Sequence, residues 1–238
     1  MKRVLVITDS VGLPRPWDNI PYEDTYLHAL EKSGDISMWV ASEGGFPIVK
    51  MNNNILHLTR YLSDKMFDFG ILQLGIIDCA PRPIPNRARK VIANFPTPIR
   101  NRTVNFLHKH RAFIQKNLWS FQITPVKKFR KEFDRMLGNM DRLCNHVFII
   151  MIIPGKPSIE EHSPGLIEAT QRYNQEIETI SRKYRNTTLI DVYEQLSADP
   201  GKYLTDDLHI TKEAHKLIWD ELYESMVQTE KNQQPSQS

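Results

Sequence analysis

The sequence predicts an α/β protein in which a parallel sheet is covered by helices on both sides. Short apolar runs rich in β-branched residues alternate five times with segments of helical spacing, a pattern typical of parallel strands joined by crossover helices. Two of these runs, 4–7 and 147–153, are apolar throughout, as expected for strands buried on both faces.

Three strands and two helices are expected before residue 80. Each strand is an apolar run that stops at small or polar residues, and each helix has apolar residues three or four apart. The first helix, from Tyr22, ends before Gly34, a residue type favoured just beyond a helix C-terminus. The strands are expected over 4–10, 36–41 and 68–74, and the helices over 22–32 and 53–62.

The second half is expected to add two strands and four longer helices. Pro96 and Pro98 mark a break before a loosely amphipathic helix, and Pro125 precedes the next helix. The polar segment 228–238 is predicted to be a disordered tail, which leaves 1–227 as a single domain. The strands are expected over 147–153 and 188–191, and the helices over 103–119, 126–143, 163–184 and 211–227.

Two segments near opposite ends of the chain carry residues suited to nucleophilic catalysis. Ser10 follows the first apolar run directly, and open parallel sheets place their active sites beyond the carboxyl ends of their strands. Near the other end, Asp206, Asp207 and His209 share a short loop before the last helix. A histidine can accept a serine proton, and a carboxylate three residues earlier can orient its imidazole. Asp207 points elsewhere if the loop is extended.

Together these segments resemble the SGNH/GDSL hydrolase superfamily. Its serine follows the first strand in a Gly-Asp-Ser motif, of which this chain keeps Asp9 and Ser10 and replaces the glycine with Thr8; Asp206 and His209 match its late Asp-x-x-His motif. The resemblance implies a three-layer α/β/α sandwich with a five-stranded parallel, flavodoxin-like sheet. It also implies a catalytic triad with Ser10 as nucleophile, His209 as general base and Asp206 as the group that orients it.

The resemblance further implies an oxyanion hole at the ends of the first three strands. Besides the Ser10 backbone, Gly44 or Gly45 after the second strand is the expected donor, because glycine lets a backbone N–H approach a ligand closely; a simple tight turn is the alternative. The family's asparagine donor falls at Ile77, which cannot donate. Loss of one such donor typically lowers the rate about 10²–10³-fold.

Four further residues are expected to bind substrate: Asp9, Trp17, Asp78 and Arg82. Asp78 aligns with the aspartate of the family's Gly-x-Asn-Asp block. Trp17 either walls a substrate pocket or anchors its proline-rich loop by packing. Arg82 either brings a permanent positive charge to the oxyanion in place of the missing asparagine, or pairs with Asp78 and shapes the loop.

Charge is distributed unevenly along the chain. The net charge is +3, yet residues 86–131 contain twelve Lys and Arg and no Asp or Glu. Because this segment lies between the third and fourth strands, we expect a basic helical insertion over the active-site face that attracts an anionic substrate or lies against an anionic membrane surface. The alternative is a solvated charged face on ordinary helices. No nucleic-acid partner is expected, since no recognition motif is present.

Several classes of function lack support in the sequence. There is no metal-ligand spacing, phosphate-binding loop or nucleotide fingerprint, so the expected mechanism uses no metal and no cofactor. No run approaches the roughly 20 apolar residues of a membrane span, and no signal-peptide pattern follows Met1, which predicts a cytoplasmic protein. Cys79 and Cys144 are expected to be buried free thiols.

The leading functional prediction is a serine hydrolase that cleaves a carboxylic O-acyl ester through an acyl-Ser10 intermediate. The substrate is expected to be a small molecule or a glycan, and the basic segment favours an anionic one. One alternative is an O-acyltransferase that uses the same acyl-enzyme on a surface glycan. The other is a non-catalytic binding module, which Ile77 favours and the intact Ser10, Asp206 and His209 oppose.

Overall fold

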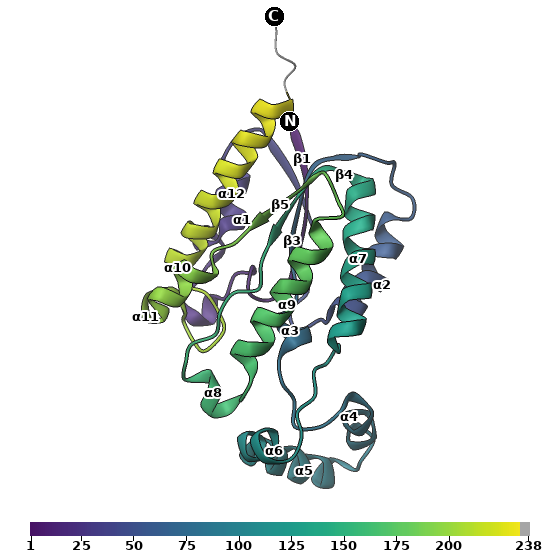
Figure 1. The fold of residues 1–238 in the computed structure, drawn as a ribbon, viewed down its shortest axis with the longest axis vertical. Helices are drawn as coiled ribbons and strands as arrows, with labels where there is room; N and C mark the ends of the chain where they lie inside the picture. Colours follow the sequence, from purple (N-terminus) through teal and green to yellow (C-terminus); the bar gives the residue numbers. More distant parts are fainter. Residues whose placement is uncertain (234–238) are drawn as a thin grey trace, which may run out of the picture.

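Five parallel strands form one sheet at the centre of the protein (Figure 1). The structure is a computed structural model that describes residues 1–233, except for the side chains at 57, 58 and 233. The strand order is β2-β1-β3-β4-β5, the flavodoxin-like order, and the predicted fold class is confirmed. The strands are β1 Lys2–Thr8, β2 Ile36–Val40, β3 Phe67–Gln73, β4 Cys144–Ile150 and β5 Thr187–Ile190.

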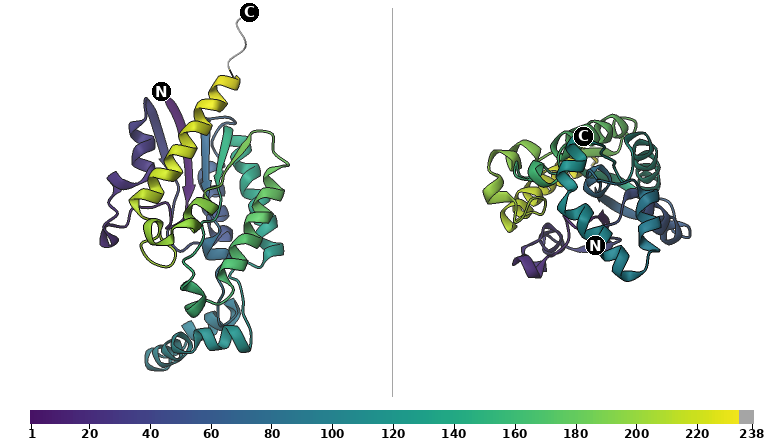
Figure 2. Two further views of the ribbon diagram at one scale, coloured as in Figure 1. Left: turned by 60° about the vertical axis from the view of Figure 1, so that its left-hand side comes forward. Right: turned by 90° about the horizontal axis from the view of Figure 1, so that it is seen from below.

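Helices cover both faces of the sheet and make a three-layer sandwich (Figures 1 and 2). α1 and α12 pack together on one face, and α2, α7 and α9 pack side by side on the other. Because both faces are covered, the central strands are almost entirely buried. The long helices are α1 Tyr26–Lys32, α2 Ile48–Thr59, α7 Val126–Leu143, α9 Leu166–Ser181 and α12 Lys212–Gln233.

Short helices occupy the connections, several of them at the carboxyl end of the sheet. Among residues 1–233, no helix combines the length and apolar character needed to cross a membrane. Both cysteines are buried and free, as predicted. The short elements are the 3₁₀ helices η1 Pro16–Asp18 and η2 Tyr22–Asp24, and α3 Ile76–Cys79, α8 Ile159–His162, α10 Tyr193–Ala198 and α11 Pro200–Tyr203.

The last helix is longer than the sequence predicts. α12 continues to Gln233, so residues 228–233 are helical and the prediction of a disordered tail is wrong for them; residues 234–238 lie outside the described part of the chain. An ion pair between Lys2 and Glu230 ties this end of α12 to the start of β1. A polar sequence can therefore remain helical here because tertiary contacts support it.

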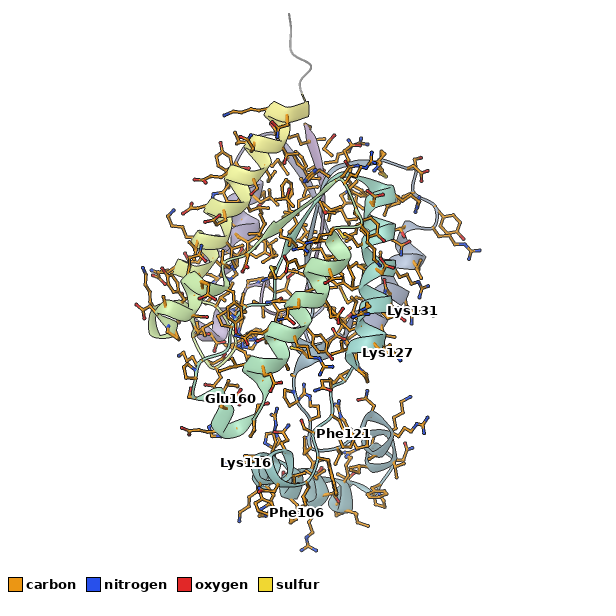
Figure 3. All side chains as sticks on the ribbon, viewed as in Figure 1. Phe106, Lys116, Phe121, Lys127, Lys131 and Glu160 are labelled. Carbon is orange, nitrogen blue, oxygen red and sulfur yellow. The ribbon has the colours of Figure 1, made fainter. Side chains whose placement is uncertain are left out.

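The basic segment 86–131 divides between two parts of the structure. α4 Asn86–Ala93, α5 Thr97–Lys109 and α6 Arg111–Asn117 project beyond the carboxyl ends of the strands, whereas residues 126–131 belong to α7. Figure 3 shows Lys127 and Lys131 on α7 and Phe106 on the projecting helices. Since α7 buries Phe129 completely against the core, its basic residues form the solvated face of a core helix, and this part of the segment is not an insertion.

A two-residue bridge closes the base of the projecting helices. The Arg82 N–H donates to the Phe121 carbonyl at 2.7 Å, and the Phe121 N–H donates to the Arg82 carbonyl at 3.0 Å. We refer to residues 82–121 as the arm. The arm contains nine Lys and Arg and no acidic residue. It leaves the body beyond the carboxyl ends of the strands (Figure 2), which is the end at which Ser10 follows β1.

A buried polar cluster lies under the carboxyl end of β1. The hydroxyls of Thr8 and Tyr26 both donate to Gln73 Oε1, at 3.1 and 2.8 Å. Gly12 packs directly on this cluster: a Cβ at this position would lie 2.3–2.6 Å from oxygen atoms of the three side chains. The loop after β1 can therefore fold onto the cluster only because residue 12 has no side chain.

Gly12→Ala is expected to lower the free energy of unfolding by about 1–3 kcal/mol, because the added methyl group must displace buried hydrogen-bonded groups. Gly201→Ala is the matched control, since a Cβ there would meet its nearest atom at 3.6 Å. Urea denaturation of both variants measures the difference. Equal stabilities would show that the loop does not press on the cluster as described.

Candidate active site

Hydrogen bonds to the neighbouring strand and within the turn hold the loop after β1. The Asp9 N–H donates to the Gln73 carbonyl at 3.0 Å, and the Val11 N–H donates to Asp9 Oδ1 at 3.0 Å. Asp9 is 2% exposed, so its carboxyl group lies inside the protein and organises the turn. Its predicted contact with substrate is therefore wrong. Ser10, the next residue, is partly exposed at the carboxyl end of the sheet.

Ser10 and His209 lie side by side although 199 positions separate them in the chain. Ser10 Oγ is 3.5 Å from His209 Nε2, and His209 Nδ1 is 2.7 Å from Asp206 Oδ2. The hydroxyl, imidazole and carboxylate thus form a continuous chain of polar contacts. This is the arrangement in which an imidazole can accept a serine proton while a carboxylate holds its other nitrogen.

The Asp206 carboxylate is held in its charged form. Burial alone would raise the pKa of Asp206, but hydrogen bonds from the Leu208 and His209 N–H groups, both at 2.7 Å to Oδ1, and from the imidazole lower the pKa below its ordinary value. A charged carboxylate at Nδ1 favours the imidazole tautomer with the proton on that nitrogen. Nε2 is then free to accept a proton from Ser10.

Arg15 adds a positive charge at the outer edge of this chain. Its guanidinium donates to Asp18 at 2.6 Å and lies 3.8 Å from Asp206 Oδ2. Arg15 was not among the residues predicted from the sequence, where its only signal is a basic residue in the proline-rich loop that follows Ser10. Its guanidinium also lies 5.3 Å from the centre of the Trp17 ring. Trp17 is 73% exposed, which excludes the alternative that it anchors the loop by packing.

Asp207 faces away from the imidazole and docks the turn on the body. Its Oδ1 accepts from the Ser158 hydroxyl at 2.9 Å, and its carbonyl accepts from the Lys156 N–H at 3.0 Å. Both partners lie in the loop after β4. The two adjacent carboxylates therefore have different roles: Asp206 holds the imidazole, and Asp207 holds the turn against the body of the protein.

Gly44 lies beside Ser10. A Cβ on Gly44 would be 3.5 Å from the Ser10 Cβ, whereas a Cβ on Gly45 would meet nothing within 4 Å. Gly45 has φ of +76°, so it supplies the tight turn while Gly44 supplies the close approach. Within residues 1–233, the backbone N–H groups of Ser10 and Gly44 have no hydrogen-bond acceptor in the chain, which leaves both available to a ligand oxygen.

Asp78 secures the loop that contains Gly44. It is 1% exposed, and its two oxygens accept from the Ile48 N–H at 3.2 and 3.0 Å, which fixes the start of α2. At the other end of the loop, the Ser42 hydroxyl accepts from the Thr8 N–H at 3.1 Å. Asp78 was predicted to bind substrate; the structure instead shows a buried group that positions this loop.

Two buried carboxyl groups thus lie beneath the site. Burial raises the pKa of Asp9 to about 7, against the opposing effect of backbone hydrogen bonds. Burial likewise raises the pKa of Asp78 to about 7; hydrogen bonds from Thr124 and Ile48 oppose this shift, and the nearby Asp9 charge adds to it. Each group is therefore poised between its neutral and charged forms near neutral pH.

Arg82 does not pair with Asp78, one of the two roles predicted for it. Within the described residues it forms no ion pair with Asp78 and no hydrogen bond to Ser10, and its side chain lines a cavity in the arm together with other arginines. Ile77 is partly buried and packs against the core. The structure of residues 1–233 shows no group of three or more His, Cys, Asp or Glu side chains that could hold a metal ion.

Comparison with known proteins places this geometry in a recognised fold. No family model and no curated protein matches the sequence. Solved structures match over nearly the whole chain. A member of the lipolytic protein G-D-S-L family from Veillonella parvula has a TM-score of 0.58 at 11% identity, covering 94% of this chain and 98% of its own. The lipase/acylhydrolase from Enterococcus faecalis has a TM-score of 0.58 at 12% identity, covering 100% of both chains.

A third match is the psychrotrophic esterase EstA from Pseudoalteromonas, in a structure inhibited by monoethylphosphonate, with a TM-score of 0.56, 14% identity and coverage of 96% and 98%. The chain has the SGNH/GDSL hydrolase fold. The resemblance inferred from Asp9-Ser10 and from the Asp206 and His209 spacing is confirmed at the level of the fold. In this SGNH/GDSL fold, Ser10, Gly44 and His209 meet at the carboxyl end of the sheet.

The raised pKa values predict an unusual pH dependence of stability. Unfolded carboxyl groups ionise near pH 4, whereas Asp78 keeps its proton to about pH 7 in the folded protein. Between these values the folded state binds more protons, so this group's contribution to stability falls as the pH rises. The stability of Asp78→Asn relative to the unmodified protein should therefore increase between pH 5 and 7, by up to about 1.4 kcal/mol per pH unit.

Urea denaturation across this pH range measures the effect, with Glu224→Gln, a change at an exposed carboxylate, as the control. The control should show a difference from the unmodified protein that does not change with pH. A similarly flat difference for Asp78→Asn would contradict a proton held on this carboxyl group up to neutral pH.

Proposed function

We propose that the protein is a serine esterase that cleaves a carboxylic O-acyl ester through an acyl-Ser10 intermediate. The observation that supports this most strongly is the chain of contacts from Ser10 through His209 to Asp206 at the carboxyl end of the SGNH/GDSL fold. The matched structures are described as lipolytic, as a lipase/acylhydrolase and as an esterase, which agrees with ester cleavage as the reaction class.

In this mechanism His209 moves one proton in each half of the reaction. Nε2 takes the Ser10 proton as Oγ bonds to the ester carbonyl carbon, and the carbonyl electron pair moves to oxygen. When the tetrahedral intermediate collapses, the bond to the alcohol oxygen breaks and His209 gives that oxygen its proton. Water then attacks the acyl-Ser10 carbonyl carbon as His209 takes its proton; the bond to Oγ breaks, the carboxylic acid is released and His209 returns the proton to Oγ. The charge of Asp206 stabilises the imidazolium at each stage.

The backbone N–H groups of Ser10 and Gly44 are the proposed donors to the oxyanion. Both lack an acceptor within residues 1–233, and Gly44 lies next to Ser10, since a Cβ on Gly44 would be 3.5 Å from the Ser10 Cβ. Preorganised donors of this kind stabilise charge that develops in the transition state. With Ile77 in the third donor's position, the two backbone groups supply the stabilisation alone.

Ser10→Ala is expected to lower kcat for p-nitrophenyl ester hydrolysis by at least about 10³-fold, because the nucleophile is lost. Ser120→Ala, at an exposed hydroxyl in the arm, should leave kcat unchanged. Retention of activity in a folded Ser10→Ala variant would reject the acyl-enzyme mechanism. Analysis of the products with and without a sugar acceptor then separates hydrolysis, which releases the free acid, from O-acyl transfer to a glycan.

The adjacent carboxylates offer a matched pair of variants. Asp206→Asn is expected to lower kcat by about 10²–10⁴-fold, since an amide at Nδ1 favours the tautomer whose Nε2 already carries a proton. Asp207→Asn keeps an oxygen acceptor for the Ser158 hydroxyl and should change kcat by less than about 10-fold. Steady-state kinetics of both variants provides the comparison. Equal losses would show that the imidazole does not depend on Asp206.

A further inference from the structure

The arm contains a cavity that the proposed ester chemistry does not use. Its volume is about 340 Å³, and it lies between α4, α5 and the segment that enters the arm. Four arginines line it: Arg82, Arg89, Arg100 and Arg111. None of the four forms an ion pair with an acidic side chain among residues 1–233.

Several donors at this cavity lack partners. Arg111 donates to the Pro81 carbonyl at 3.0 Å and to the Ser163 hydroxyl at 2.7 Å, but its Nε and that of Arg82 are buried with no acceptor in the described part of the chain. Burial, and then the charges of Arg111 and Arg89, lower the pKa of Arg82 to about 10. Like charges are thus held together without a counter-ion, and an anion in the cavity would relieve this repulsion.

The rest of the lining is apolar. Ile84, Ile92, Val104 and Leu107 contribute to the wall between the arginines. A small inorganic anion would satisfy the guanidinium groups but leave this surface in contact with water. A ligand that combines an anionic group with an apolar chain would cover both. Arginine favours phosphate in particular, because its planar guanidinium makes paired hydrogen bonds to phosphate oxygens.

The outer surface of the arm is suited to the same kind of ligand. α4 and α5 have no buried residue, and large apolar side chains of the arm are 37–62% exposed. Phe106 lies at the far end of the arm from the sheet (Figure 3). Basic helices with exposed aromatic side chains are typical of segments that lie in a lipid interface. The exposed apolar side chains are Val91, Phe95, Ile99, Val104, Phe106, Phe113, Leu118 and Trp119.

We infer that the arm cavity binds a phosphate-bearing amphiphile, with the four arginines around the phosphate and the apolar wall against the chain. The ligand's chemistry is common to a phospholipid in an anionic membrane and to a free phosphorylated lipid. This binding does not depend on the proposed esterase activity. Ser10 follows the carboxyl end of β1, and the arm projects beyond the same end of the sheet. A ligand bound in the arm is therefore held on the side of the protein where the proposed reaction takes place.

Calorimetric titration of the full chain with dihexanoyl phosphatidic acid, a soluble probe, tests the site directly. The double variant Arg89→Gln with Arg100→Gln should weaken binding at least about 10-fold, since it removes two guanidinium contacts to phosphate. The matched control is Arg87→Gln with Arg102→Gln, which removes the same charge from α4 and α5 at exposed positions outside the cavity. The control should change the affinity by less than about 3-fold, because neither of its arginines lines the cavity and charges outside it are screened by solvent and salt.

Co-sedimentation with vesicles identifies the source of the ligand. A membrane phospholipid is supported if the protein sediments with vesicles of phosphatidylcholine and phosphatidic acid but not with phosphatidylcholine alone. The two double variants should then rank in sedimentation as they do in calorimetry. Binding of the soluble probe without sedimentation supports a free phosphorylated lipid. Equal weakening by the two double variants, absence of binding at millimolar probe, or displacement of the probe by single-stranded DNA would each overturn the inference. If the protein does not bind the probe but hydrolyses esters at a normal rate, the inference about the arm fails while the proposed esterase function stands.

Discussion

The carboxylate of Asp206 is the group on which the geometry of the site depends most. It accepts hydrogen bonds from two backbone N–H groups and from the imidazole of His209, so one side chain both closes the turn and orients the imidazole. The Thr205 N–H closes the same turn by donating to the His209 carbonyl at 2.8 Å, and Lys156 fixes the turn from outside by donating its N–H to the carbonyl of Asp207. Without these contacts, nothing in the turn would hold the imidazole of His209 in the orientation that faces Ser10.

The other half of the site rests on a buried polar layer beneath the carboxyl end of the sheet. Asp9 holds the loop of Ser10, Asp78 holds the loop of Gly44, and Gln73 joins the hydroxyls of Thr8 and Tyr26. Hydrogen bonds between buried polar groups favour one arrangement of the groups that make them, although the Nε2 of Gln73 has no partner among the described residues. This layer therefore places the two loops beside each other. It does so by burying two carboxyl groups, and burial raises the pKa values of both.

The fold was predictable because its signals are local, whereas the pairing of Ser10 with His209 was implied only by the resemblance of their two motifs to the SGNH/GDSL superfamily. An apolar run ends where its strand ends, and a carboxylate three residues before a histidine can reach the imidazole within one turn. The directions of Asp78 and Arg82 were not predictable, because each is set by a partner far along the chain. Asp78 turns inward to Ile48, 30 positions away, and Arg82 turns into a cavity whose other walls come from α4 and α5.

The structure of the basic segment 86–131 was likewise only partly predictable from its sequence. Charge alone does not distinguish a projecting helix from the solvated side of a core helix. The difference between the arm and the first turns of α7 lies in which apolar residues are covered: Phe129 is fully buried, whereas Phe106 is 59% exposed. The sequence contains both kinds of apolar residue, but only the packing of α7 against the sheet shows which of them form the core.

The central claim is that Ser10 is an activated nucleophile, and covalent labelling tests it most directly. Treatment of the folded protein with an alkyl phosphonate ester that reacts with activated serines, followed by mass-spectrometric mapping of the peptides, should give one adduct at Ser10 and a parallel loss of esterase activity. An adduct at another residue, or unlabelled Ser10 in a protein that still hydrolyses esters, would contradict the account.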